Sequence, residues 1–169
     1  MSNPKQPQTD HQNPSREFLK ARSEPFVSDQ QKGIPSGPVE TPPPDDAERI
    51  ALPAPDAFSC GQMPLREVIG QRRSRRRFSS APLTIEELAF VCWATLGMQK
   101  VFEGGHVVWR TVPSAGARHA LQLYLAVGNV QGLPKGLYRY LALEHALAVL
   151  KTDNAILDKT ARACFDQRW

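Results

Sequence analysis

Cysteine is scarce in this sequence, with three residues among 169. Cys60, Cys92 and Cys164 lie far apart, and no CxxC spacing is present. The sequence therefore lacks the paired-cysteine signatures of zinc sites and of dithiol redox sites. We expect reduced thiols that are buried in the folded part.

Long apolar runs are also missing. No stretch approaches the roughly 18 consecutive apolar residues that a membrane-spanning helix needs, and the first residues lack the apolar core of a signal peptide. The composition is otherwise that of an ordinary globular protein, with 41% hydrophobic and 22% charged residues. We expect a soluble cytoplasmic protein without a membrane partner.

Patterns that would indicate a metal site or an acid–base pair are absent as well. The adjacent residues Glu86 and Glu87 are interpreted as helix surface and helix cap. The four histidines share no ligand spacing, so we predict no metal site and interpret each of them as a surface or core residue. They are His11, His106, His119 and His145.

Proline is abundant, and its distribution marks a boundary. Of the 15 prolines, 11 lie within the first 55 residues, where the only aromatic residues are Phe18 and Phe26. Such a chain buries too little apolar surface to offset the entropy that folding costs. We predict that residues 1–56 form a disordered or loosely extended Pro-rich segment, and that residues 57–169 form the folded domain.

Two helices are predicted at the start of this domain. The first covers residues 64–71, where apolar residues form one stripe. The second begins with Thr84 and Glu87, whose S/T-x-x-E spacing is a capping box, and Gly97 is its predicted end. Residues 98–112 are interpreted as loop, with the adjacent glycines 104 and 105, and residues 113–120 as a short turn or helix.

The hydrophobic period then changes from helical to extended. Residues 121–127 form a short apolar run that predicts a strand buried on both faces. Residues 136–140 and 145–150 predict two further strands, and the three together indicate an antiparallel meander. The pattern reverts to helix after Asp153, a candidate cap.

Residues 71–78, QRRSRRRF, place five arginines around one serine. Arginine grips phosphate oxygens with a planar fork of donors, and a serine hydroxyl can complete such a site. A solvated basic run or a nucleic-acid patch are the alternatives. Because no aromatic residues are interleaved and no second basic cluster follows, nucleic acid is the weaker alternative even at a net charge of +4.

Small residues at 114–116 lie directly before the predicted strand at 121–127. They permit a flat ring to approach the main chain and to accept hydrogen bonds at its polar edge, as a flavin does. The alternative is a simple turn that connects a loop to a strand.

The two segments together resemble a known family. The motifs are RRS-x-R-x-F at 72–78, P-L-T-x-E-E-L at 82–88, R-T-x-P-S-A-G-A at 110–117, L-x-L-Y at 121–124 and G-L-Y-x-Y at 136–140. In this order they are similar to FMN-dependent nitroreductases, and within these to the SagB-type dehydrogenase branch. The resemblance spans about residues 63–169. It implies an α+β fold in which helices pack on a central, mainly antiparallel sheet.

The resemblance also implies a cofactor, FMN, and the residues that hold it. Residues of the first motif would contact the FMN phosphate and ribityl chain, and residues of the third would border the isoalloxazine ring. Arg75 and Arg77 have no implied role, and Arg118 and His119 depart from what relatives often carry. The implied FMN contacts are Arg72, Arg73, Ser74, Arg76, Pro113, Ser114, Ala115 and Gly116.

The implied activity is an oxidoreductase in which hydride passes through flavin N5, so no catalytic side chain is assigned. NAD(P)H is the expected electron donor, and the substrate is a small nitro or quinone compound or a modified peptide. A homodimer is expected. Because the domain of the family extends well beyond a point that matches Trp169, we expect an incomplete domain. The alternative is a catalytically inactive fragment, or an interaction partner of a complementary chain.

Overall fold

The computed structural model describes residues 27, 29, 31–34, 37–102 and 107–166. Residues 1–26 of the predicted Pro-rich segment and the adjacent glycines 104 and 105 lie outside this described part. The chain divides into two compact units, Met1–Ser36 and Gly37–Trp169. In the first unit, the backbone N–H groups of Lys32 and Ile34 donate to the Asp29 carbonyl and close a turn. All elements below belong to the second unit.

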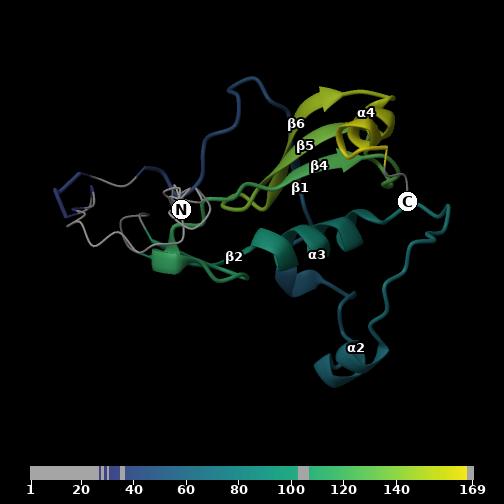
Figure 1. Ribbon diagram of the computed structural model, residues 1–169, viewed down its shortest axis with the longest axis horizontal. Helices are drawn as coiled ribbons and strands as arrows, with labels where there is room; N and C mark the ends of the chain where they lie inside the picture. Colours follow the sequence, from purple (N-terminus) through teal and green to yellow (C-terminus); the bar gives the residue numbers. More distant parts are fainter. Residues whose placement is uncertain (1–26, 28, 30, 35–36, 103–106, 167–169) are drawn as a thin grey trace, which may run out of the picture. The chain divides into compact units, whose positions relative to one another are not determined.

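A four-stranded antiparallel sheet forms the centre of the second unit (Figure 1). Its strands lie in the order β1-β6-β5-β4. Short turns connect β4 (Tyr124–Val127), β5 (Gly136–Leu141) and β6 (Ala146–Thr152). The predicted antiparallel meander is confirmed.

The fourth strand, β1 (Arg49–Ala51), comes from the segment that was predicted to be disordered or loosely extended. It pairs with β6 in the register Ile50 to Leu147, and Leu52 is buried directly after it. The structure therefore places the start of the packed part before residue 56. A three-residue strand has too few residues to show a period, and only its pairing with β6 orders it.

The prediction that residues 121–127 form a strand buried on both faces was wrong in two respects. Only residues 124–127 are in the strand, and β4 lies at the edge of the sheet. Tyr124 is 52% exposed and Val127 is 4% exposed, so one end of the strand faces solvent.

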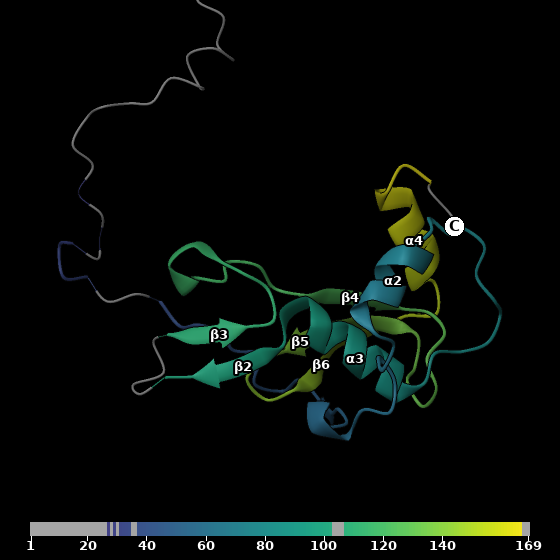
Figure 2. The same ribbon diagram turned by 90° about the horizontal axis from the view of Figure 1, so that it is seen from below.

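Helix α3 (Ile85–Leu96) forms as its capping box predicts. The Glu87 N–H donates to the Thr84 hydroxyl, and the Glu87 carboxylate accepts from the Thr84 N–H at 2.8 Å. Figure 2 shows α3 lying along one face of the sheet. Its buried residues pack into one core with residues of β5 and β6, namely Leu88, Ala89, Cys92, Leu96, Tyr138, Tyr140 and Leu147.

Gly97 ends α3 as predicted, although it does so with an extended backbone. A Cβ atom at this position would lie 2.4 Å from the Trp93 carbonyl oxygen, which explains the glycine. The next residues were predicted to be loop, but they form a hairpin of β2 (Met98–Val101) and β3 (Val108–Arg110). Phe102 stacks edge-on with Trp109 at 5.0 Å, and the Lys100 ammonium lies over both rings. These contacts across the hairpin stabilise strands too short to be recognised locally.

Helix α2 (Leu65–Gln71) has the predicted extent, but none of its residues is buried. It belongs to a longer run, residues 61–83, in which every residue is exposed. We call this run the projecting segment. At its start, Glu86 accepts hydrogen bonds from the N–H groups of Ser59 and Cys60. At its end, Leu83 donates to the carbonyl of Asn129. Both ends are therefore fixed, while the part between them is solvated.

Three short helices complete the unit. A single 3₁₀ turn, η1 (Pro55–Ala57), follows β1, and another, η2 (Ala115–Ala117), matches the turn predicted at 113–120. Helix α4 (Ile156–Ala163) packs against β4. The Asp153 carboxylate accepts from the Ala155 N–H at 2.9 Å, one residue before the helix, so it orders the turn into α4.

The three thiols differ in environment. Cys92 is fully buried in the core, and burial raises the pKa of its thiol to about 12, so it stays protonated at neutral pH. Cys60 is half-buried and Cys164 is exposed. The prediction of buried thiols is therefore confirmed for Cys92 and was wrong for Cys164. Within the described residues, no helix is long and apolar enough to cross a membrane.

Loss of the α3 cap is expected to destabilise the whole unit. Thr84→Ala removes the hydroxyl that accepts from Glu87 N–H, which costs about 1 kcal/mol of unfolding free energy. Urea unfolding at neutral pH measures it, with Thr152→Ala at the exposed end of β6 as the control. Equal midpoints for Thr84→Ala and wild type would contradict the role of the cap.

The stability that Glu86 contributes through its hydrogen bonds with residues 59 and 60 is expected to depend on pH. Hydrogen bonds from the Cys60 N–H, then from Ser59, lower the pKa of Glu86 from its ordinary value of 4.5. A lowered folded-state pKa stabilises the protein above pH 4.5, and this contribution is lost as the pH falls through the folded value. Glu86→Gln should therefore lower the urea midpoint at pH 7, and the difference from wild type should shrink below pH 4.5. A difference that is constant with pH would refute this origin.

Candidate functional site

The candidate site lies where the hairpin strand β3 runs into the turn that precedes β4. This turn, residues 113–119, has an unusual backbone: Gly116, Ala117 and His119 have φ angles of 62°, 53° and 44°. L-residues seldom adopt this left-handed conformation, and such strain is concentrated at functional sites. The His119 N–H donates to the Ser114 hydroxyl at 2.8 Å, which holds the turn closed.

An open cavity of about 370 Å³ adjoins this turn. Pro113 and Ser114, both predicted to border a flavin ring, line it together with Trp109, which is 54% exposed. Ala115 and Gly116, the other two residues of that prediction, lie in η2 and do not line it. A Cβ atom at Gly116 would meet only the Arg118 side chain, at 3.8 Å, so the backbone there is open to a ligand.

The four predicted phosphate contacts lie elsewhere, in the projecting segment. Arg72, Arg73, Ser74 and Arg76 are all exposed. The Arg73 guanidinium donates to the carbonyls of Gly70 and Arg72, and no described carboxylate pairs with an arginine of this run. Neither of the two cavities described here is lined by residues 71–78. The structure therefore does not bring the two predicted halves of the flavin site together.

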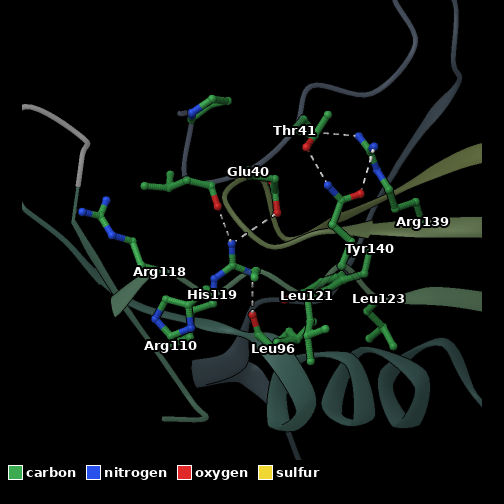
Figure 3. A pocket seen from close by; sticks show the side chains of 14 residues that line it. Glu40, Thr41, Leu96, Arg110, Arg118, His119, Leu121, Leu123, Arg139 and Tyr140 are labelled. Atoms are coloured by element: carbon green, nitrogen blue, oxygen red, sulfur yellow. Dashed lines mark hydrogen bonds and ion pairs between the residues drawn. The ribbon is translucent and has the colours of Figure 1, made fainter. Parts of the chain in front are cut away.

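A second, more enclosed cavity of about 120 Å³, which we call the inner cavity, adjoins the first (Figure 3). Arg110 and His119 line both cavities. The inner cavity is closed by the strap, which we define as residues 38–41. Sequence analysis placed Arg110 in a motif without a role, left His119 unassigned, and missed the strap completely, because its contacts join residues about 70 to 100 positions apart.

Arg110 is the central side chain of this region. Its side chain is only 4% exposed, and its guanidinium donates to the carbonyls of Leu96 at 3.3 Å and Val39 at 3.1 Å. The nearest described carboxylate is that of Glu40, at 3.8 Å. Glu40 is itself held by the backbone N–H groups of Ala142 and Leu143. This network ties the strap to α3, to β3 and to the turn after β5.

Tyr140 and His145 form a partly buried hydrogen-bonded pair at the turn between β5 and β6. The Nε2 of His145 contacts the Pro53 carbonyl at 2.8 Å, and because a carbonyl only accepts, Nε2 must carry the proton. Nδ1 then accepts from the Tyr140 hydroxyl at 2.8 Å. Burial raises the pKa of Tyr140, so its hydroxyl stays a donor. Both ring nitrogens of His145 are therefore hydrogen-bonded to protein groups. Among the described residues, no three His, Cys, Asp or Glu side chains are grouped to hold a metal ion.

Comparison with known proteins adds to this geometry. No family model matches the chain. A "putative nitroreductase" of Methanocaldococcus jannaschii is 37% identical over 86 residues, which make up 51% of this chain and 41% of that protein. The crystal structure of a "putative nitroreductase" from Ralstonia eutropha aligns with a TM-score of 0.51 and 30% identity, over 72% of this chain and 49% of that one. The chain is similar to nitroreductases.

These similarities confirm the predicted α+β, nitroreductase-like fold and support the predicted resemblance to the nitroreductase family. The chain spans less than half the length of both relatives. Neither relative is named as a SagB-type dehydrogenase, so that branch stays a prediction.

Proposed function

We propose that this chain supplies an FMN site to an oxidoreductase of the nitroreductase type, in its SagB-type branch. The observation that carries the proposal is the open cavity beside the strained turn at residues 113–119. Pro113 and Ser114 line it at the position where the resemblance expects the flavin ring. The volume of about 370 Å³ falls within the usual range for small-molecule sites.

The chemistry of the residues near the open cavity and in the projecting segment suits FMN. Pro113 and Ser114 line the open cavity, and Ser114 offers a hydroxyl to the edge of a flat ring. The arginines of the projecting segment have no described carboxylate partner and suit the FMN phosphate. When bound, FMN supplies the hydride chemistry at its N5, with NAD(P)H as the proposed donor and a small molecule or modified peptide as substrate. The protein then binds, orients and shields.

The visible spectrum tests this proposal. Purified chain is mixed with excess FMN and the unbound dye is removed; retained absorbance in the flavin bands is the expected result. Arg72→Gln combined with Ser74→Ala should weaken binding about 100-fold, because two phosphate contacts of about 1.5 kcal/mol each are lost. The matched control, Arg75→Gln with Ser79→Ala, removes the same residue types from positions without an implied role and should leave binding unchanged.

A colourless wild-type chain would contradict FMN binding by this chain alone. It would favour the alternative, a catalytically inactive fragment or an interaction partner of a complementary chain. Salt-sensitive retention on DNA without flavin would instead favour the basic run as a nucleic-acid patch.

We further propose a homodimer in which the projecting segment packs on the second copy. This segment exposes large apolar side chains that nothing described covers, including Leu65 at 73%, Ile69 at 68% and Phe78 at 72%. Exposed apolar residues that cluster on one segment mark interaction surfaces. A second copy would also supply its own open cavity to the arginines of this segment.

Leu65→Glu combined with Ile69→Glu is expected to convert a dimer to a monomer, because both charges would be buried in the contact. Light scattering coupled to gel filtration measures the mass. The control, Val101→Glu with Leu143→Glu, places two charges at exposed apolar positions outside the segment. A wild-type chain that is monomeric at all concentrations would overturn the proposal.

A further inference from the structure

The inner cavity behind Arg110 is built like a site for a small anion. Two buried arginines line it, Arg110 and Arg139, whose exposed fractions are 7% and 6%. Figure 3 shows the Arg110 guanidinium between the strap and α3, with Arg139 at the other end of the strap. Burial of a guanidinium is costly unless its charge is compensated.

One donor of Arg110 has no partner. Its Nε is fully buried and makes no hydrogen bond, whereas the other two nitrogens donate to carbonyls of Leu96 and Val39. No other buried side-chain nitrogen or oxygen in the described part of the chain is left in this way. The Arg110 side chain is only 4% exposed and forms part of the cavity wall. Because buried donors are almost always hydrogen-bonded, the unpaired Nε indicates that an acceptor is missing here.

The charges around the cavity do not balance. Arg139 donates to the Thr41 carbonyl at 2.9 Å and to the Gln122 side chain at 3.5 Å, and among the described residues it has no ion pair. Glu40 is the one carboxylate that lines the cavity. It lies 3.8 Å from Arg110 and is shared with two backbone N–H groups. Of the two buried guanidinium charges one is therefore in excess, and the exposed Arg118 adds a third arginine to the lining.

The rest of the lining is mixed: Arg118, His119 and Gln122 contribute polar side chains, and apolar side chains come from Pro38, Leu96, Leu121 and Leu123. A short organic acid can place its carboxylate on the arginines and its chain against the apolar side chains, a contact that an inorganic anion cannot make. We propose that the inner cavity binds a small aliphatic carboxylate between Arg110 and Arg139. This inference does not rest on the proposed function, because the cavity is lined by none of the predicted FMN contacts.

Calorimetry on the full chain in Tris chloride tests the proposal, with butyrate as the probe. Butyrate should bind, and n-butanol, which has a similar chain and no charge, should bind much more weakly. Inorganic phosphate should not compete. Equal binding of butanol would show a merely apolar cavity, and phosphate that displaces butyrate would show a site for inorganic anions; either result would overturn the proposal.

Two variants change the affinity in opposite directions. Glu40→Gln removes the one negative charge and keeps an oxygen for the Ala142 N–H, so butyrate should bind roughly tenfold more tightly. Arg139→Gln removes a cation and should weaken binding by about tenfold or more. Arg49→Gln is the matched control, since Arg49 forms a surface ion pair with Glu144 and does not line the cavity.

Arg110→Lys removes the planar fork while keeping the charge, and should also weaken binding. Circular dichroism decides whether each variant is folded. If Arg110→Lys unfolds, the opposite shifts of Glu40→Gln and Arg139→Gln still decide the question. No butyrate binding to folded wild type, or equal affinities in Glu40→Gln, Arg139→Gln and the Arg49→Gln control, would refute the site.

Discussion

The packing of α3 on the antiparallel sheet is the interaction on which the rest of the structure depends. Ala89 and Cys92 of the helix are fully buried against Tyr138 and Leu147 of the sheet. Helix α3 ends at Gly97, and the β2–β3 hairpin starts at the next residue. The Thr111 hydroxyl donates to the Trp93 carbonyl, so the helix also positions the chain that leads to the candidate site.

Buried arginines set a second constraint at the same end of the core. Arg110 and Arg139 donate hydrogen bonds to backbone carbonyls of the strap. The Glu40 carboxylate, in turn, accepts a hydrogen bond from the turn after β5. In this arrangement of the strap most of the buried donors are paired, as buried polar groups in proteins usually are. The one donor left over, Nε of Arg110, is what distinguishes the inner cavity from a packing defect.

The structure places the two predicted parts of the FMN site in different regions of the chain. The arginine run and the residues before β4 were assigned to one ligand, but one lies on the exposed projecting segment and the other beside the open cavity. The segment is anchored at both ends by Glu86 and Leu83, and its apolar residues have no described partner. A second copy of the chain would cover them and account for both features.

Local sequence patterns are sufficient for several elements: the capping box at Thr84 specifies the start of α3, and apolar runs separated by turn residues specify β5 and β6. The motif order of the sequence also indicated the similarity to nitroreductases that the comparisons show. The tertiary structure alone decided the short strands β1, β2 and β3, which are too short to show a period and are ordered by pairing with distant residues. It alone placed Glu40 against Arg110, because ion pairs between residues 70 positions apart leave no local signal.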